Sequence, residues 1–384
     1  MRLGLVHKRL DLNGGTERDL FRTAEGLRDL GHDVHLFCSE YAVPPPLGTV
    51  AHRLPVLPLG RTARLWSFAL RTPRIIQAQR CDVIVSFGRT LHQDVLRSGG
   101  GTHRGFLHRL GQEGGPHRRL WQKISAYHRS LLSLEKRQFR APELKRIIAV
   151  SAEVKQDILE NYPVSEEKIV VLYNGVDLEH FYPRGGGEVR QTIRRRWKIP
   201  VDAPLVLFVG SGFRRKGLDR LISLWESPEL AQVYLLVVGH DARLNRYRAR
   251  VRQLEGKRII FAGRQEDIAH YYAAADVLAL PALQEAFGNV VVEALASGLP
   301  VLVSRGVGAA EILTGSLAGK IVDHPEDPNE LQAKLLLLLE QAQDPRCAEE
   351  ARTIAQKYSW RNHFKRLEVL LMETAKSQSE PRVA

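Results

Sequence analysis

Hydrophobic residues occur along this chain in short runs that are separated by stretches with helical spacing. An apolar run at 2–6 precedes a helical stretch over 16–30, and Gly31 ends that stretch at the start of a second apolar run, 31–38. A strand, a helix and a strand in this order predict a βαβ unit with a parallel sheet. Further apolar runs typical of buried strands lie at 81–87, 146–151, 169–173, 204–210, 233–239, 258–263, 276–281 and 301–303.

The length of the chain favours two domains. The run at 204–210 opens a second series of strands and helices, and 384 residues with 44% hydrophobic content suffice for two cores. Three distant cysteines, Cys38, Cys81 and Cys347, predict no disulfide framework and indicate a reducing compartment. We expect no membrane span, because no apolar run reaches ~18 residues, and no signal peptide at the N-terminus.

The stretch 281–300 lies between two apolar runs, and its pattern predicts a loop followed by a helix. Gly288 can open this helix and Gly298 can end it. Apolar residues occupy nearly every side of the helix, which places it inside the domain. The start of such a helix offers backbone N–H groups and a positive dipole end, which together hold an anion such as a phosphate.

Two carboxylates interrupt this apolar pattern. Glu285 lies just before the helix start, and Glu293 lies eight positions later, about one turn inside the helix. Carboxylates are strong acceptors for sugar hydroxyls, so an anion and a polyol could bind at the same helix end. Each carboxylate could instead form an ion pair in the core, because buried charges are usually paired.

The spacing of Glu285 and Glu293, with Phe287-Gly288 after the first Glu, resembles the donor-site signature of family 4 of the retaining glycosyltransferases. The resemblance covers nearly the whole chain and is best over 174–323. It implies that Glu285 holds hydroxyls of the donor sugar and that Glu293 holds the nucleotide ribose. The donor-binding residues that it implies in this stretch are Glu285, Ala286, Phe287, Gly288, Asn289, Val290 and Glu293.

Two adjacent cations, Arg215 and Lys216, follow the strand predicted at 204–210. Fixed cations there can neutralise a diphosphate that gains charge as it leaves, and a solvated loop is the alternative. The resemblance matches both cations to the family's Arg and Lys. It also implies donor binding by Gly212 in the same loop and by the backbone around Gly263 and Arg264. The chain has no Asp-x-Asp pattern, so we expect no metal ion and no cofactor, only a nucleotide sugar as co-substrate.

The N-terminal half contributes a diglycine, Gly14-Gly15, between the first strand and the first helix. Such a pair lets backbone approach a ligand closely, although the pattern is not a dinucleotide-binding fingerprint. The resemblance places Gly14 and Gly15 at the donor diphosphate, and Arg18 and Asp19 match a charged pair of its lipopolysaccharide-core branch. Surface charge on a first helical turn is the alternative for that pair.

A histidine, His103, follows the glycine run at 99–101. The resemblance matches this segment to the family's active-site histidine loop, and a loop histidine without a role is the alternative. Including this histidine, the residues expected to act in catalysis are Asp19, His103, Arg215, Lys216 and Glu285.

The resemblance also implies the domain organisation. The segment Asn174-Gly175-Val176-Asp177 is similar to the family's interdomain connection, and the last helix, starting near Trp360, crosses back to the first domain in proteins of this fold. We therefore expect an α/β protein of the GT-B fold, with two facing Rossmann-like domains, parallel sheets and a cleft between them. The first domain spans 1–173 and is completed by about 360–384, and the donor-binding domain spans 174–359.

The positive charge is concentrated in one region. Residues 61–146 hold 18 Lys and Arg against 5 Asp and Glu, which accounts for the whole formal charge of +13. Such a region suggests an anionic partner: a membrane surface, a phosphorylated acceptor or nucleic acid; a solvated basic face is the alternative. Helical spacing over 118–140, with Trp121 and Tyr127, predicts an interfacial helix or a core-facing helix with a basic side. No nucleic-acid-binding signature accompanies the charge, so we expect no nucleic-acid partner.

Taken together, these features favour a retaining glycosyltransferase that moves a hexose, with glucose expected, from a UDP-sugar to a glycolipid or oligosaccharide acceptor. The resemblance favours a heptose of the lipopolysaccharide core as acceptor, and a peripheral protein on the cytoplasmic face of the inner membrane. Two other functions stay open: a sugar-nucleotide epimerase of the same fold, and a non-catalytic protein that binds anionic membranes or nucleic acid.

Overall fold

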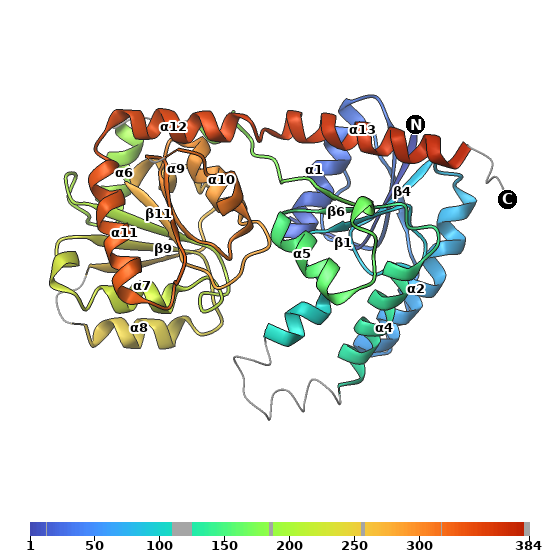
Figure 1. The fold of residues 1–384 in the computed structure, drawn as a ribbon, viewed down its shortest axis with the longest axis horizontal. Coiled ribbons are helices and arrows are strands. Elements are labelled where there is room, and N and C mark those ends of the chain that lie inside the picture. The colour runs from blue at the N-terminus through green and yellow to red at the C-terminus, as the bar shows by residue number, and fades with distance from the viewer. Residues whose placement is uncertain (13, 110–124, 184–186, 255–257, 316, 380–384) are drawn as a thin grey trace. The chain divides into compact units, whose positions relative to one another are not determined.

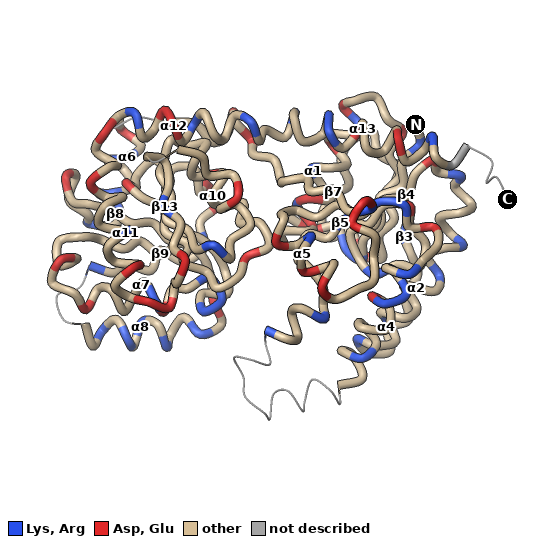
Figure 2. Tube along the Cα trace, in the orientation of Figure 1, with Lys and Arg blue, Asp and Glu red and all other residues tan. Residues whose placement is uncertain are grey.

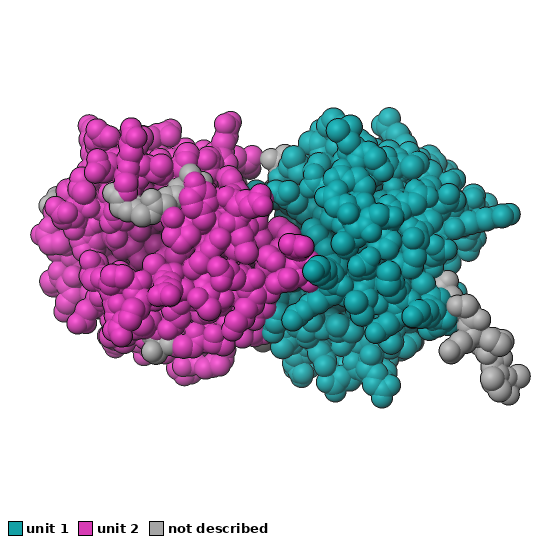
Figure 3. Space-filling view, turned by 90° about the horizontal axis from the view of Figure 1, so that it is seen from above, with its two compact units in different colours: residues 1–173, 363–384 teal, residues 174–362 magenta. Residues whose placement is uncertain are grey.

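The computed structural model describes residues 1–12, 14–109, 125–183, 187–254, 258–315 and 317–379. The chain divides into two compact units, with Met1–Tyr173 and His363–Ala384 in unit 1 and Asn174–Asn362 in unit 2 (Figure 3). Each unit has its own parallel sheet and its own covering helices (Figure 1).

In the described part of unit 1, seven parallel strands form a sheet in the order β3-β2-β1-β4-β5-β6-β7. The order changes direction between β1 and β4, and ligands of such sheets bind beyond the carboxyl ends of the strands at that point. The strands are β1 (Arg2–Leu10), β2 (Asp33–Tyr41), β3 (Val50–Arg53), β4 (Val83–Ser86), β5 (Val95–Ser98), β6 (Arg146–Ala149) and β7 (Ile169–Val171).

Helices cover both faces of this sheet, because successive strand residues face opposite sides. Leu5 of β1 packs in one core with α1 (Gly15–Asp29) and α13 (Trp360–Ser379). Its neighbour Val6 packs in a second core with α2 (Gly60–Ala78). The C-terminal helix thus completes the core of unit 1, and Figure 1 shows most of α13 lying along this unit. The remaining named α-helices of unit 1 are α4 (Ala126–Arg140) and α5 (Ala152–Asn161).

The helix expected over 118–140 is not continuous. Ser125 has an extended backbone, and its side chain accepts a hydrogen bond from the backbone N of His128, so it caps α4. A capping hydroxyl satisfies one of the N–H groups of the first turn, and the helix therefore begins at Ala126. Residues 110–124, with the expected anchor Trp121, lie outside the described residues.

In the described part of unit 2, six parallel strands form a sheet in the order β10-β9-β8-β11-β12-β13, whose order changes direction between β8 and β11. The predicted α/β class, two Rossmann-like domains with parallel sheets, is confirmed. The strands are β8 (Leu205–Val209), β9 (Tyr234–Val238), β10 (Ile259–Gly263), β11 (Val277–Leu280), β12 (Val301–Ser304) and β13 (Gly319–Val322). The helices are α6 (Glu188–Arg196), α7 (Leu218–Leu224), α8 (Leu244–Arg252), α9 (Ala269–Ala274), α10 (Asn289–Ala296), α11 (Pro328–Gln341) and α12 (Pro345–Gln356).

Backbones approach closely at the carboxyl ends of β8, β9 and β10. Gly239 has φ 136°, its N–H donates to the carbonyl of Gly263 at 2.8 Å, and a Cβ there would overlap the carbonyl of Gly210. We expect Gly239→Ala to lower the free energy of unfolding by roughly 2–4 kcal/mol, because it combines positive φ with a backbone clash. Denaturant unfolding measures this loss.

Gly263→Ala is the matched control for that substitution. Gly263 also has positive φ, 72°, but no atom lies within 4 Å of a Cβ built there. The Gly263→Ala variant should therefore lose only about 1 kcal/mol of its free energy of unfolding, from backbone strain. Equal losses in both variants would show that the close approach at Gly239 has no effect on stability.

Candidate functional site

The loops that follow β8 and β11 meet where the strand order of unit 2 changes direction. The loop after β8 is held tightly, because Gly217 has φ 84° and a Cβ there would overlap the carbonyl of Pro281, just after β11. Phe213 of the same loop is fully buried, and its backbone N donates to Asp241 Oδ2 at 2.8 Å. This fixed loop also carries Gly212, at φ 70°, and the two expected cations.

Arg215, Lys216 and Glu285 come together at this place. Arg215 Nη1 donates to Glu285 Oε2 at 2.5 Å, and Lys216 Nζ lies 3.6 Å from the same oxygen. The side chains of Lys216 and Glu285 are 10% and 17% exposed, whereas that of Arg215 is 52% exposed. Lys216 lies against Gly210, since a Cβ at Gly210 would be 2.7 Å from Nζ. Two cations share one carboxylate here, which leaves an excess of positive charge.

Glu285 is held by its backbone as well. Its N–H donates to the carbonyl of Gly306 at 2.9 Å, and its own carbonyl accepts from the N–H of Gly308 at 2.9 Å. Ala286 is half-buried, and Phe287, which follows it, is buried and accepts from the N–H of Ala309. The expected sugar-binding carboxylate therefore stands on a backbone that is fixed at both sides.

Helix α10 begins beside this cluster. Gly288 precedes it at φ 93° in the left-handed region, and no side chain caps the start of the helix. The side chain of Asn289, the first helical residue, accepts from Asn174 Nδ2 at 2.8 Å, and Val290 beside it is half-buried. The uncapped helix start and the two cations suit an anionic group.

Glu293 lies one turn inside α10, where Tyr272 Oη donates to its Oε2 at 2.7 Å. Tyr272 is buried and packs edge-on against Phe181 at 5.8 Å between ring centroids. Gly263 ends β10 with open space beside it, and the following Arg264 is exposed. The structure brings Arg215, Lys216 and Glu285 together, and Arg264 follows β10, the edge strand of this sheet.

In unit 1, Asp19 is not a surface charge. It is buried in α1, and its Oδ2 accepts from Nε and Nη2 of Arg97 at 2.8 and 2.6 Å. Arg18, the other member of the expected charged pair, donates instead to the carbonyl of Leu12 at 2.9 Å and is exposed. Gly14 precedes α1 directly and Gly15 is its first residue, with no atom within 4 Å of a Cβ built at Gly15.

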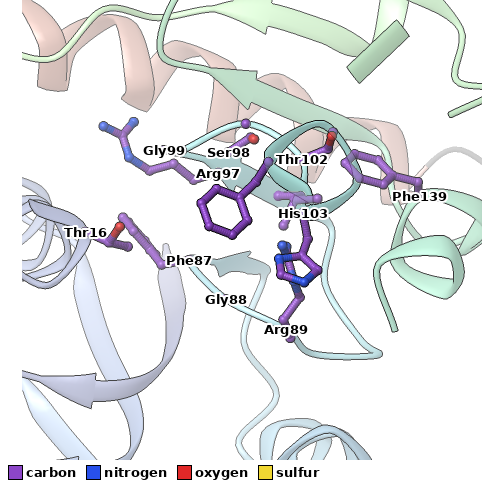
Figure 4. Close-up of a pocket in the computed structure, with 14 residues that line it drawn as sticks. Thr16, Phe87, Gly88, Arg89, Arg97, Ser98, Gly99, Thr102, His103 and Phe139 are labelled. Atoms are coloured by element: carbon purple, nitrogen blue, oxygen red, sulfur yellow. The ribbon is translucent and has the colours of Figure 1, made fainter. Parts of the chain in front are cut away.

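A cavity of about 280 Å³ opens beside this ion pair (Figure 4). It lies at the carboxyl ends of β4 and β5, and the expected His103 forms part of its wall together with Arg89 and Arg97. Aromatic rings and a glycine run supply most of the remaining wall. These further lining residues are Thr16, Phe87, Gly88, Leu96, Ser98, Gly99, Gly100, Gly101, Thr102, Phe106 and Phe139.

The imidazole of His103 is neutral at neutral pH. Burial, with further contributions from Arg89 and His128, lowers the pKa of His103 to about 4. Its Nε2 lies 3.0 Å from Nδ1 of His128, and burial also lowers the pKa of that residue. A neutral ring can donate or accept hydrogen bonds toward the cavity without adding charge to it.

Two glycosyltransferase family models match the chain. Glycosyltransferase Family 4 matches residues 13–180, almost wholly in unit 1, and Glycosyl transferases group 1 matches residues 189–357, within unit 2. The chain belongs to the family 4 glycosyltransferases. The activity class and the GT-B fold that the sequence predicted are thereby confirmed.

Its relatives include enzymes of lipopolysaccharide synthesis. Lipopolysaccharide glucosyltransferase WaaG of Escherichia coli (strain K12) is 26% identical over 331 residues, 84% of this chain and 86% of that protein. The crystal structure of WaaG, at 25% identity, covers 96% of this chain and 99% of its own with a TM-score of 0.80. Anabaena Alr3699/HepE, solved in complex with UDP-glucose, is 20% identical and shares the fold, with a TM-score of 0.72 over 97% of this chain and 100% of its own.

The sequence did not predict every residue of these sites, and Arg89, Arg97, Glu135 and Tyr272 are examples. Arg97 pairs with Asp19 at a separation of 78 positions, and Tyr272 contacts Glu293 at a separation of 21 positions. Glu135, which pairs with Arg89 of the cavity wall, is one of the five acidic residues in the basic region. Its position at helical spacing between Leu131 and Phe139, on the apolar side of a predicted helix, was the available signal.

Tyr272 gives a prediction for nucleotide binding. We expect Tyr272→Phe to weaken UDP affinity by about 1 kcal/mol, roughly fivefold, because Glu293 loses the hydroxyl that orients it. Calorimetric titration with UDP measures the change. Tyr271→Phe is the matched control, because its equally buried hydroxyl pairs with Trp197 Nε1 at 3.4 Å instead. Equal affinity losses in the two variants would argue against orientation of Glu293.

Proposed function

We propose that this glycosyltransferase moves glucose from UDP-glucose to a heptose of a lipopolysaccharide core, with retention of anomeric configuration. The observation that carries the donor half is the cluster of Arg215, Lys216 and Glu285 beside the uncapped start of α10. The excess positive charge suits a diphosphate, and the carboxylate suits the hydroxyls of a sugar attached to it. The likeness to WaaG, a lipopolysaccharide glucosyltransferase by name, supports glucose and a lipopolysaccharide acceptor.

The proposed reaction separates charge at the bond between the sugar and the diphosphate. That bond breaks, the diphosphate oxygen keeps the electron pair, and Lys216 and Arg215 stabilise the growing negative charge. The acceptor oxygen forms the new bond on the face that the diphosphate leaves, and its proton passes to the leaving diphosphate. Front-face attack follows from the family rather than from a distance in this structure.

We propose that this step needs no metal ion. The two cations support this, because one buried Lys and one Arg can balance much of the charge of a diphosphate. The same chain supplies the charge that a bound metal would otherwise supply.

The acceptor half of the proposal rests on the cavity in unit 1. Both of its arginines are already paired, Arg97 with Asp19 and Arg89 with Glu135, and His103 is neutral. Polar groups without excess charge, next to aromatic rings, suit the hydroxyls and apolar faces of a sugar. This composition supports a glycan acceptor in unit 1.

Turnover of a panel of nucleotide sugars, with and without a deacylated lipopolysaccharide core ending in heptose, tests the proposal. We expect UDP-glucose to give a core enlarged by one hexose in the presence of EDTA. Release of a free sugar at the same rate without acceptor would instead favour an epimerase or a hydrolase. Activity that EDTA abolishes and Mg²⁺ or Mn²⁺ restores would contradict the metal-free step.

We further propose that unit 1 binds an anionic membrane surface. No described helix is long and apolar enough to cross a bilayer. Helices α2 and α4 pack together, with Trp66 Nε1 donating to Ser130 Oγ at 3.0 Å and Arg61 stacked over Tyr127. Basic residues gather on both helices (Figure 2). Each such charge contributes about 1 kcal/mol near an anionic bilayer.

Exposed arginines on these helices give a vesicle-binding prediction. Replacing four of them with Gln should release the protein from anionic vesicles, as high salt should, while activity on the deacylated core survives. Co-sedimentation measures binding, and neutral vesicles should bind neither protein. The four are Arg64, Arg71, Arg74 and Arg129.

An equal loss of charge on α8 of unit 2 is the control for this prediction. Four exposed arginines lie at the N-cap of this helix and along it: Arg243, Arg246, Arg248 and Arg252. Replacing these with Gln should leave vesicle binding nearly unchanged. If both fourfold variants weaken binding equally, only net charge matters and the α2–α4 surface is not the anchor.

A further inference from the structure

Glu135 of α4 is a fully buried carboxylate whose partners include two residues of the cavity wall. Its Oε1 accepts from Arg89 Nη2 at 2.6 Å and from the backbone N of His103 at 2.7 Å. Its Oε2 accepts from Tyr162 Oη at 2.6 Å and from the backbone N of Arg104 at 3.2 Å. Four donors on two oxygens compensate the burial of this charge.

These contacts fix the start of the helical segment 103–109. Glu135 takes the N–H groups of its first two residues, and Thr102 Oγ1 accepts the N–H of Gly105 at 2.9 Å. A helix start normally leaves such groups unpaired or open to a ligand. Here these N–H groups bond to side chains of the protein, so the backbone of His103 is held in place before any substrate binds.

A second buried carboxylate holds the same loop from another side but reaches no residue of the opposite wall. Asp157 accepts from the backbone N of Thr102 at 2.5 Å and from Arg109 Nη1 at 3.1 Å. A Cβ at Gly105 would overlap its carboxylate, so the loop lies directly on it. Glu135 differs because it joins the loop to Arg89, which comes from the segment after β4.

We propose that Glu135 is a positioning residue, which holds the backbone of His103 and the guanidinium of Arg89 in one fixed arrangement at the cavity wall. The role rests on the proposed function, because it serves acceptor binding in that cavity. Gln at this position keeps the size of the side chain but loses its charge and turns an NH₂ group toward donors. Arg89 and the loop can then no longer both be held.

We expect Glu135→Gln to lower kcat for transfer from UDP-glucose to the deacylated core by about 10- to 100-fold, since small misplacements have effects of this size. The affinity for UDP should stay unchanged, because the charged residues proposed to bind the donor, Arg215, Lys216, Glu285 and Glu293, belong to unit 2. Arg89→Gln in the Glu135→Gln background should cause little further loss. Independent, multiplying losses in the double variant, or a parallel loss of UDP affinity, would overturn the proposal.

Asp94→Asn is the control for stability. Asp94 is a half-buried carboxylate at the amino end of β5, away from the cavity, and its Oδ2 accepts from the backbone N of Ile84 at 2.8 Å. This variant should lose stability without losing kcat per folded molecule. A similar fall of kcat in Asp94→Asn would show that the loss in Glu135→Gln comes from general destabilisation.

Hydrogen exchange of the substrate-free protein separates this proposal from the proposed function. In Glu135→Gln the amides of His103 and Arg104 should exchange at least about tenfold faster, as expected for loss of a charged hydrogen-bond partner, and in Asp94→Asn they should not. Unchanged exchange at these two amides would overturn the positioning role whatever reaction the protein catalyses. If the two amides exchange faster in Glu135→Gln but the wild-type protein transfers no sugar to the core, Glu135 still positions the backbone of His103. The acceptor assignment would then be wrong instead.

Discussion

Glu285→Gln is expected to lower sugar transfer by about 100-fold or more while leaving the affinity for UDP nearly unchanged. Glu285 shares its Oε2 with Arg215 and Lys216, and its backbone is fixed by Gly306 and Gly308. Gln fills the same space but is a weaker acceptor for sugar hydroxyls and no longer balances the two cations. The rate of sugar transfer should fall because charge and orientation at the sugar matter most in the transition state. Steady-state kinetics and calorimetry with UDP measure the two effects separately.

Glu293→Gln is the counterpart with the opposite pattern. Glu293 lies one turn inside α10, where it accepts from Tyr272, and we propose that it holds the nucleotide ribose. It should therefore weaken UDP affinity more strongly than it lowers kcat. If both variants lose UDP affinity equally, the division between a sugar-binding and a ribose-binding carboxylate is wrong.

Lys216→Ala is expected to lower kcat by roughly 2–4 kcal/mol of transition-state stabilisation, with a smaller effect on donor binding. The Lys216 side chain is only 10% exposed and lies beside Gly210 and Glu285, so solvent screens its charge little. Arg215→Ala should act in the same direction but less strongly, because the Arg215 side chain is half exposed. Single-turnover rates and donor dissociation constants for both variants measure the difference.

Two outcomes would contradict this role of the cations. Donor affinity could fall as much as kcat, which would mean that Lys216 holds the ground state and the transition state equally. Arg215→Ala could also lower kcat more than Lys216→Ala does. Burial would then not determine how strongly each cation stabilises the transition state, and the exposed guanidinium of Arg215 would be the principal contact of the diphosphate.

The sequence predicted the parts of the fold that local pattern determines. The apolar runs at 204–210 and 276–281 predicted β8 and β11, and the switch point between these strands explains why Lys216 and Glu285, 69 positions apart, lie in contact. The pattern could not predict Arg97 beside Asp19 or Glu135 beneath His103, because neither pair follows from periodicity. Such partners depend on which side of a sheet each loop reaches.

In the basic region, the count of charged residues located the basic surface correctly, but the predicted start of the helix was wrong. Helical spacing continued across Ser125, and the prediction therefore started the helix at 118. The serine hydroxyl caps α4 instead, and Tyr127 lies under Arg61 of α2. Charge counting located the region, but the pairing of α2 with α4 appears only in the structure.

The anomeric configuration of the product tests the account most directly. UDP-glucose carries an α-linked glucose, and transfer to the deacylated core in EDTA can be followed by the coupling constant of the new anomeric proton. We predict an α-linked glucose on the core, formed without added metal ion. A β-linked product, or free glucose with an unchanged core, would contradict retaining transfer at the cluster of Arg215, Lys216 and Glu285.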